Sequence, residues 1–223
     1  MIVAIDGPAA SGKSTVAKAL ATRMGLAYLD TGAMYRAVAV EAVRRGIDLT
    51  DASALTALAN AVAVSFSHDE GAAMPTHVLV DGRDVTGAIR SPEIDAAVSP
   101  VSAVPGVREA MVDQQRRIAA ESASTVLEGR DIGTVVFPNA DVKVFLTASA
   151  QERARRRTID MHDRGVEMTP SEVQAKLESR DLYDSTREAS PLACAGDAEL
   201  IDTTGMTIDE VVGRIASLVE ARR

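Results

Sequence analysis

The chain has 223 residues, of which 46% are hydrophobic, and a formal net charge of −8 at pH 7. This length allows one α/β core with a smaller inserted piece. The acidic balance argues against non-specific nucleic-acid binding, which needs cations to neutralise backbone phosphates. No apolar run approaches the ~20 residues that cross a bilayer, and the single cysteine, Cys194, cannot form an internal disulfide. We therefore expect a cytoplasmic monomer with no nucleic-acid polymer and no membrane as partner.

The N-terminal segment has the pattern of a phosphate-binding loop. An apolar run at 2–5 is followed by Gly7-x4-Gly12-Lys13-Ser14, and then by residues of helix-forming composition. Strand, glycine loop and helix thus follow in the order that a phosphate cradle requires, with backbone N–H groups aimed at phosphate oxygens. Lys13 is expected to reach the β and γ phosphates of ATP, and the Ser14 hydroxyl to hold Mg²⁺. The predicted nucleotide-binding residues are Gly7, Pro8, Ala9, Ala10, Ser11, Gly12, Lys13, Ser14 and Thr15.

Four further apolar segments predict buried strands joined by helical crossovers. They are residues 27–29, 125–128, 142–146 and 199–202. Together with 2–5 they predict a five-stranded parallel sheet with helices on both faces, the three-layer α/β/α architecture of P-loop NTPases. Helices are expected at 13–24, ended by Gly25, and at 33–45, ended by Gly46, with a turn at 30–32 before the second.

Residues 62–86 interrupt this alternation. Two strand-like runs, 62–67 and 77–80, are followed by Asp81-Gly82, a strong hairpin signal, and by a third short run. A small antiparallel insert is therefore predicted outside the main sheet. Two helices, 92–102 and 105–120, are expected to follow, each opened by a proline.

The basic residues are unusual in kind and placement. Of the 24, only four are lysine, and arginine is the side chain that grips phosphate through two parallel hydrogen bonds. A helix that begins at a Ser149–Glu152 capping box places three arginines on one face, and a second capping box at 169–172 opens the next helix. The arginines expected on the ligand side of the sheet or on this helical hairpin are Arg36, Arg130, Arg153, Arg156, Arg157, Arg180 and Arg187.

The histidines do not suggest a catalytic base. His68, His77 and His162 have no carboxylate partner that the sequence can place, so all three are predicted to be surface residues. A phosphate acceptor needs no such base, because its oxygen is already ionised near neutral pH.

Four blocks of sequence together resemble the bacterial cytidylate kinases. They are IDGP at 5–8, LDTGAMYR at 29–36, EGRDIGTVVFP at 128–138 and Arg180-Asp181-x2-Asp184-x2-Arg187-x3-Pro191-Leu192, and the likeness runs over essentially the whole chain. The resemblance implies transfer of the γ-phosphoryl group of ATP to CMP or dCMP, with Mg²⁺. It also implies a core (1–61, 103–152 and 188–223), an acceptor-binding insert (62–102), and a lid with its following helix (153–187).

The resemblance further implies roles for individual side chains. The acceptor phosphate would be bound by Arg36, Arg130 and Arg187, and the cytosine edge by Ser99, Arg108 and Asp131. The sugar would be bound by Arg180 and Asp184, and the rest of the pocket wall would be formed by Thr31 and Tyr35. Glu128 is expected to act on the metal through water. The side chains expected to act on the transferring group are Lys13, Arg130, Arg153, Arg157 and Arg187.

Two other interpretations remain open from the sequence. Another small P-loop kinase, acting on UMP, GMP or shikimate, shares the loop and the lid but should lack the blocks around Arg130 and from Arg180 to Arg187. A GTP-dependent switch is suggested by DxxG matches at 84–87 and 202–205. Such matches are common by chance, and no Asn-Lys-x-Asp guanine-binding motif occurs in the chain.

Overall fold

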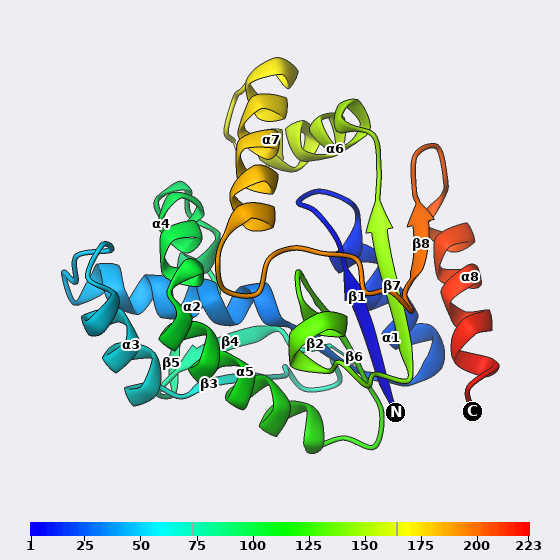
Figure 1. Ribbon diagram of the computed structural model, residues 1–223, viewed down its shortest axis with the longest axis horizontal. Coiled ribbons are helices and arrows are strands. Elements are labelled where there is room, and N and C mark those ends of the chain that lie inside the picture. Colours follow the sequence, from blue (N-terminus) through cyan, green and yellow to red (C-terminus); the bar gives the residue numbers. More distant parts are fainter. Residues whose placement is uncertain (73, 164) are drawn as a thin grey trace.

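A parallel sheet lies at the centre of the molecule (Figure 1). The computed structural model describes residues 1–72, 74–163 and 165–223, so Ala73 of the predicted insert and Arg164 of the predicted lid lie outside the described residues. Within the described residues the sheet has five parallel strands in the order β2-β6-β1-β7-β8. Their bounds are β1 Ile2–Asp6, β2 Ala27–Asp30, β6 Thr125–Gly129, β7 Val142–Thr147 and β8 Glu199–Asp202. The predicted α/β fold class is confirmed.

Successive side chains of β1 point into two separate hydrophobic cores, one on each face of the sheet. Val3 and Ile5 pack with α1 (Lys13–Met24) and α8 (Ile208–Glu220), whereas Ala4 packs with α2 (Thr31–Arg44) and α5 (Pro105–Ala120). All three side chains are fully buried. Burial on both faces explains why the strand is a continuous apolar run instead of an alternating one.

The first two helices show what local sequence can and cannot specify. Gly25 ends α1 in the left-handed conformation, at φ 64°, as predicted. The turn predicted at 30–32 is wrong, because α2 already begins at Thr31. The Asp30 carboxylate accepts a hydrogen bond from Ala33 N at 2.9 Å, and this N-cap lets the helix start directly at the strand end.

The predicted insert is present as a three-stranded antiparallel sheet, β3 (Val64–Ser67), β4 (His77–Val80) and β5 (Arg83–Asp84). Asp81 and Gly82 both have positive φ, 50° and 78°, as the predicted hairpin requires. A helix that the sequence analysis did not foresee, α3 (Ala52–Ala61), precedes the insert. A 3₁₀ turn (Ala88–Arg90) and α4 (Pro92–Ala103) follow it.

The last third of the chain supplies a helical hairpin above the carboxyl ends of β1 and β7 (Figure 1). It consists of α6 (Ala150–His162) and α7 (Pro170–Thr186), and α7 begins with the predicted capping box at Thr169 and Glu172. A π-helical turn at Ile132–Val136 follows β6. No helix of the described part of the chain is long and apolar enough to span a bilayer.

His77 has carboxylate partners that the sequence could not place. His77 has two carboxylate neighbours, with Nε2 2.9 Å from Asp69 Oδ1 and Nδ1 2.8 Å from Asp84 Oδ2, and these carboxylates raise its pKa. Asp84 reaches the histidine only because the hairpin pairs β4 with β5. Cys194, the single cysteine, is exposed.

Glu41 on α2 ties the insert to the central domain. Its side chain is only 2% exposed, yet its carboxylate accepts hydrogen bonds from Arg44 and Arg45 on its own helix and from Arg83 on β5. The guanidinium groups of Arg44 and Arg45 lower the pKa of Glu41 from 4.5 to about 2. Because the folded-state pKa is the lower one, this stabilisation is complete above about pH 4.5 and is lost as the pH falls towards 2.

We expect Glu41→Gln to lower the free energy of unfolding by about 1–3 kcal/mol at pH 7, because three guanidinium groups lose their anion. The difference from wild type should shrink between pH 4.5 and 2. Urea denaturation at a series of pH values measures it, with Glu109→Gln, an exposed acid on α5, as the matched control. A difference that stayed constant with pH would contradict this account.

Candidate active site

The loop between β1 and α1 curls tightly because of its glycines. Gly7 has φ 149°, and a Cβ there would lie 2.0 Å from the backbone oxygen of Leu146. Gly12, at φ 92°, sits directly before the first residue of α1. These positions exclude side chains, so the backbone can close around a phosphate group in front of the helix N-terminus.

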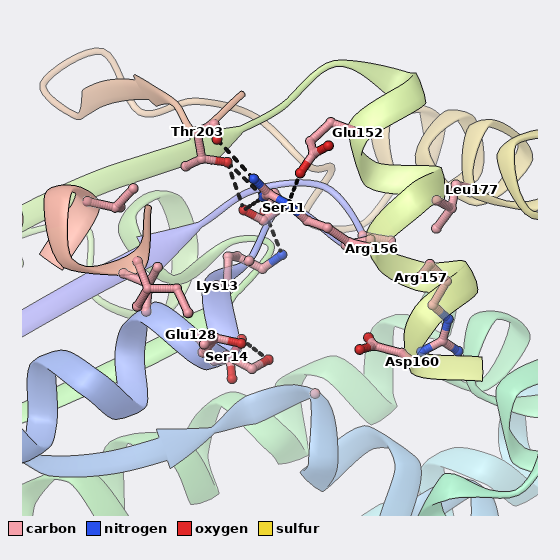
Figure 2. Close-up of a pocket in the computed structure, with 18 of the residues that line it drawn as sticks. Ser11, Lys13, Ser14, Glu128, Glu152, Arg156, Arg157, Asp160, Leu177 and Thr203 are labelled. Carbon is pink, nitrogen blue, oxygen red and sulfur yellow. Dashed lines mark hydrogen bonds and ion pairs between the residues drawn. The ribbon is translucent and has the colours of Figure 1, made fainter. Parts of the chain in front are cut away.

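Lys13 lies across this loop (Figure 2). Its Nζ donates a hydrogen bond to the Pro8 carbonyl at 2.6 Å and lies 3.4 Å from Ser11 Oγ. Burial and the nearby Arg130 hold the pKa of Lys13 well below its ordinary value. The ammonium group is thus fixed inside a cavity where its charge is costly unless an anion is close.

A cleft of about 820 Å³ opens in front of the loop. It is walled by the loop, by the ends of β2 and β6, by α6, and by the segment from Thr203 to Val211. Its lining is rich in basic side chains, namely Lys13, Arg36, Arg90, Arg130, Arg155, Arg156, Arg157 and Arg180. A cleft of this size and charge suits a nucleotide with several phosphates.

A second hollow of about 70 Å³ adjoins the cleft. Five residues line both spaces, including Arg36, Arg130 and Arg180. The residues that line only the smaller hollow are Thr31, Tyr35, Val98, Ser102, Arg108, Asp131, Asp184 and Arg187. The two compartments therefore meet at three guanidinium groups.

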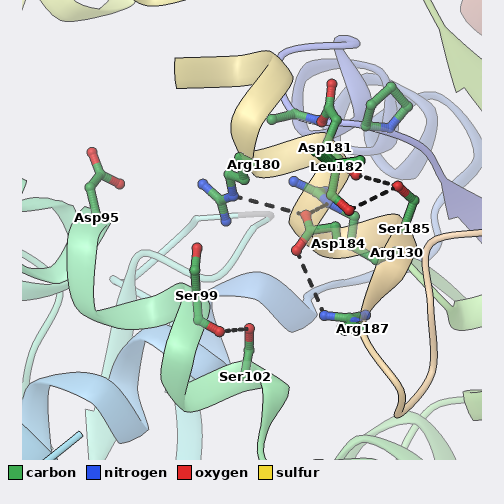
Figure 3. Close-up of polar contacts among 12 residues, drawn as sticks. Asp95, Ser99, Ser102, Arg130, Arg180, Asp181, Leu182, Asp184, Ser185 and Arg187 are labelled. Atoms are coloured by element: carbon green, nitrogen blue, oxygen red, sulfur yellow. Dashed lines mark hydrogen bonds and ion pairs between the residues drawn. The ribbon is translucent and has the colours of Figure 1, made fainter. Parts of the chain in front are cut away.

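One buried carboxylate, that of Asp184, lies among the guanidinium groups of Arg130, Arg180 and Arg187 (Figure 3). Asp184 Oδ2 accepts a hydrogen bond from Arg130 Nε at 3.0 Å, and its carboxylate lies 3.9 Å from Arg180 and 3.8 Å from Arg187. Burial and Arg130 lower the pKa of Arg180 to about 10. The site thus keeps its arginines close together by placing an anion between them.

A second buried ion pair lies deeper in the smaller hollow. Arg108 donates to Asp131 Oδ2 at 2.5 Å and to the Ser102 carbonyl at 3.0 Å, and its guanidinium lies 5.0 Å from the centre of the Tyr35 ring. Several buried polar atoms around this hollow have no hydrogen-bond partner within the described residues, namely Tyr35 Oη, Arg108 Nε, Arg180 Nε and one terminal nitrogen of Arg187. Since such atoms are normally satisfied, the hollow is suited to a polar ligand.

Two buried acids lie beneath the loop. Glu128 accepts hydrogen bonds from Tyr28 Oη at 2.5 Å and from Ser14 Oγ at 2.8 Å, and burial, with Asp30 nearby, raises its pKa to about 6. Asp6 accepts from the backbone N–H groups of Ile132 and Gly133 at 2.8 and 2.7 Å, and burial raises its pKa to about 6 as well. Asp6 therefore anchors the turn after β6 to the base of the loop.

The family model for cytidylate kinase matches residues 3–221. The chain belongs to the cytidylate kinase family. The cytidylate kinase of Desulfitobacterium hafniense (strain Y51) is 49% identical over 216 residues, which are 97% of this chain and 91% of that protein. That of Limosilactobacillus fermentum (strain NBRC 3956 / LMG 18251) is 51% identical over 219 residues, 98% of this chain and 95% of the relative. The resemblance identified from the sequence motifs is confirmed.

Among solved structures, an uncharacterized protein from Eubacterium ventriosum ATCC 27560 is similar to this chain, with a TM-score of 0.53 and 13% sequence identity. The match covers 99% of each chain. At this identity the likeness shows a shared fold and nothing about chemistry.

The structure gathers most of the site residues that the sequence predicted for this family. Loop residues 9–15, Arg36, Arg130, Arg157 and Arg180 line the cleft, and Thr31, Tyr35, Arg108, Asp131, Asp184 and Arg187 line the smaller hollow. Gly7 and Pro8 do not line the cleft, although the Pro8 carbonyl holds Lys13.

Arg153 and Ser99, two further predicted site residues, also lie outside both compartments. Arg153 donates to the carbonyls of Ala148 and Ala9, both at 3.2 Å, and pairs with Asp181. Its guanidinium therefore braces the loop from behind. Ser99 does not line the smaller hollow, where Ser102 on the same helix takes part instead. The catalytic role of Arg153 and the base contact of Ser99 stay predictions.

Arg156, expected near the ligand side but given no role of its own from the sequence, and Tyr28, not expected there, both contribute to the site. Arg156 lines the cleft and donates to Thr203 Oγ1 at 3.0 Å and to the Thr203 carbonyl at 2.9 Å, joining α6 to the loop after β8. Its position on the same helix face as Arg153 and Arg157 was the available signal. No sequence pattern indicated that Tyr28 would contact Glu128, because the contact joins residues 100 positions apart on neighbouring strands.

We expect Gly7→Ala to lower the free energy of unfolding by about 1–3 kcal/mol, because the new methyl group meets the backbone of β7. It should also weaken ADP binding, since the loop must shift to relieve the contact. Urea denaturation and equilibrium binding measure both effects. Gly87→Ala is the matched control, because a Cβ there meets nothing within 4 Å. If the Gly7→Ala variant is destabilised but binds ADP as tightly as wild type, the conformation of the loop does not determine nucleotide affinity.

Proposed function

We propose that this chain transfers the γ-phosphoryl group of ATP to CMP or dCMP, producing ADP and CDP or dCDP. The observation that carries the proposal is the meeting of two compartments at Arg36, Arg130 and Arg180. The larger one contains a phosphate loop of the kind that holds ATP, and the smaller one contains a buried pair of hydrogen-bonding groups suited to a base. A phosphoryl group that crosses between them meets positive charge throughout.

The proposed binding roles follow from the position of each group. Acceptor phosphate is held by Arg36, Arg130 and Arg187, the sugar by Arg180 and Asp184, and the cytosine edge by Arg108, Asp131 and Ser99, with Thr31 and Tyr35 completing the wall. The Asp131 carboxylate can accept a hydrogen bond from the cytosine N4 amino group, which uracil lacks.

Positioning and charge neutralisation then account for the chemistry. Phosphoryl transfer requires alignment of the two phosphates and stabilisation of charge on the transferring group. We assign this stabilisation to Lys13, Arg130, Arg153, Arg157 and Arg187. The acceptor oxygen is already ionised near neutral pH, so the site needs no histidine base.

We propose that Mg²⁺ accompanies the nucleotide, next to Ser14. The Ser14 hydroxyl is a hard oxygen ligand of the kind that this ion prefers, and the Glu128 carboxylate, 2.8 Å from it at the end of the loop, would act on the ion through water. Within the described residues no three His, Cys, Asp or Glu side chains form a metal-binding group. Few protein ligands are needed where phosphates and water complete the coordination, and the ion then supplies further charge neutralisation.

We also propose the domain division that the sequence predicted, with 62–102 as the acceptor-binding insert, 153–187 as the lid and its following helix, and the rest (1–61, 103–152 and 188–223) as core. Residues of one chain line both compartments, which supports a monomer as the active species. The single cysteine is compatible with the cytoplasm.

An acceptor panel tests the proposed reaction. With ATP, Mg²⁺ and equal concentrations of CMP, dCMP, UMP, GMP and shikimate, ADP release should be fastest with CMP or dCMP. Faster turnover of GMP, UMP or shikimate would indicate a different small P-loop kinase. Preferential binding of GTP over ATP would favour a switch.

Two substitutions separate chemistry from base preference. We expect Lys13→Ala to reduce kcat by roughly 10²–10³-fold with every acceptor, since it removes a charge at the transferring group. Asp131→Ala should instead cost about 1–3 kcal/mol in kcat/KM for CMP and less for UMP. Steady-state kinetics with both acceptors measures the difference, and urea denaturation corrects for lost stability. Equal losses of kcat/KM with CMP and UMP would show that Asp131 does not recognise the base.

A further inference from the structure

Asp95, on α4, holds two arginines that come from distant parts of the chain. Its Oδ1 accepts a hydrogen bond from Arg36 on α2 at 2.6 Å, and its Oδ2 accepts one from Arg157 on α6 at 2.9 Å. The residues are separated by 59 and 62 positions, respectively, from Asp95. One carboxylate thus joins the acceptor side of the site to the lid.

Asp95 stands behind the cavity wall. Both arginines line the large cleft, whereas Asp95 lines neither compartment. Figure 2 shows Arg157 on the lid helix beside the cleft, and Figure 3 shows Asp95 on its helix, away from the Asp184 cluster. A carboxylate in this position can hold the arginines without occupying the place of a phosphate.

Each arginine keeps hydrogen-bonding capacity for a ligand. Arg36 also donates to the Ile89 carbonyl at 3.0 Å, while Arg157 makes no other hydrogen bond within the part of the chain that the structure describes. A guanidinium group carries five N–H donors, so both side chains have donors left for phosphate oxygens. The contact with Asp95 therefore orients both guanidinium groups and leaves some of their N–H donors for a ligand.

The Asp95 carboxylate also reduces the repulsion between neighbouring guanidinium groups. Arg36 and Arg157 approach the same anion, and Arg180 is close enough that Arg36 lowers its pKa and Asp95 raises it. Without Asp95 these like charges repel one another and favour withdrawal of the lid helix from the insert. Asp184 serves Arg130, Arg180 and Arg187 in the same way.

We propose that Asp95 is a positioning residue for phosphoryl transfer, which fastens Arg157 of the lid to Arg36 of the acceptor side so that the two guanidinium groups face the transferring phosphate as a pair. The inference rests on the proposed function, because it requires two phosphates in adjoining compartments. Loss of such a tether misplaces a charge in the closed complex and slows the chemical step more than it weakens substrate binding.

Asp95→Asn tests the proposal, with Glu93→Gln as its matched control. Glu93 is an exposed acid in the first turn of the same helix, and within the described residues it makes no ion pair. We expect kcat of Asp95→Asn with ATP and CMP to fall by about 10–100-fold, whereas KM for both substrates and equilibrium ADP binding stay close to wild type. Glu93→Gln should retain wild-type kinetics.

The double variant Asp95→Asn/Arg157→Met decides whether Asp95 acts through Arg157. If it does, Asp95→Asn causes little further loss of kcat in the Arg157→Met background, whereas independent roles give multiplied losses. Asp95→Ala repeats the test if the amide disturbs folding, which urea denaturation monitors.

Three outcomes would overturn the inference while wild type still phosphorylates CMP. These are unchanged kcat in Asp95→Asn, equal losses in Glu93→Gln, or a fall in KM for CMP at unchanged kcat, which would make Asp95 a competitor of the substrate phosphate. Failure of wild type to phosphorylate CMP would instead contradict the proposed function.

Discussion

Repulsion among positively charged side chains is the constraint on which this site depends. A cavity that must hold several phosphates needs many cations within a few ångströms, and burial makes each of them costly. The protein meets this requirement by placing buried or half-buried carboxylates between the arginines. Asp184, Asp131 and Asp95 each contact at least one guanidinium group that lines a compartment, so the positive groups stay close together before any nucleotide arrives.

The parallel sheet brings these groups to one place. Loops after β1, β2 and β6 all leave the same edge, which puts the phosphate loop, Thr31 and Arg130 next to one another. The helical hairpin α6–α7 lies above this edge, and α4 of the insert lies beside α7 (Figure 1). Since each element contributes arginine and carboxylate to its neighbours, the electrostatic contacts that stabilise the site are also the contacts that hold its parts together.

Much of the fold could be predicted because its signals are local. The phosphate loop, the apolar strands and the hairpin at Asp81 and Gly82 depend on residues close together in the chain, and the structure has each of them. Contacts that depend on a long-range partner could not be placed from these local signals. His77 acquires its carboxylates through strand pairing, and Arg153 turns away from the cleft because Asp181 and the Ala9 carbonyl take its donors.

By itself, the sequence determined the family, the order of the strands along the chain and the identity of most groups around the nucleotide cavities, because motif spacing and apolar periodicity are carried by neighbouring residues. Only the tertiary structure decided which arginines face the cavities and which brace them from behind. A guanidinium group can point in many directions from one backbone position, and its direction is set by the carboxylates and carbonyls that distant segments, such as α4 with Asp95, bring within hydrogen-bonding distance.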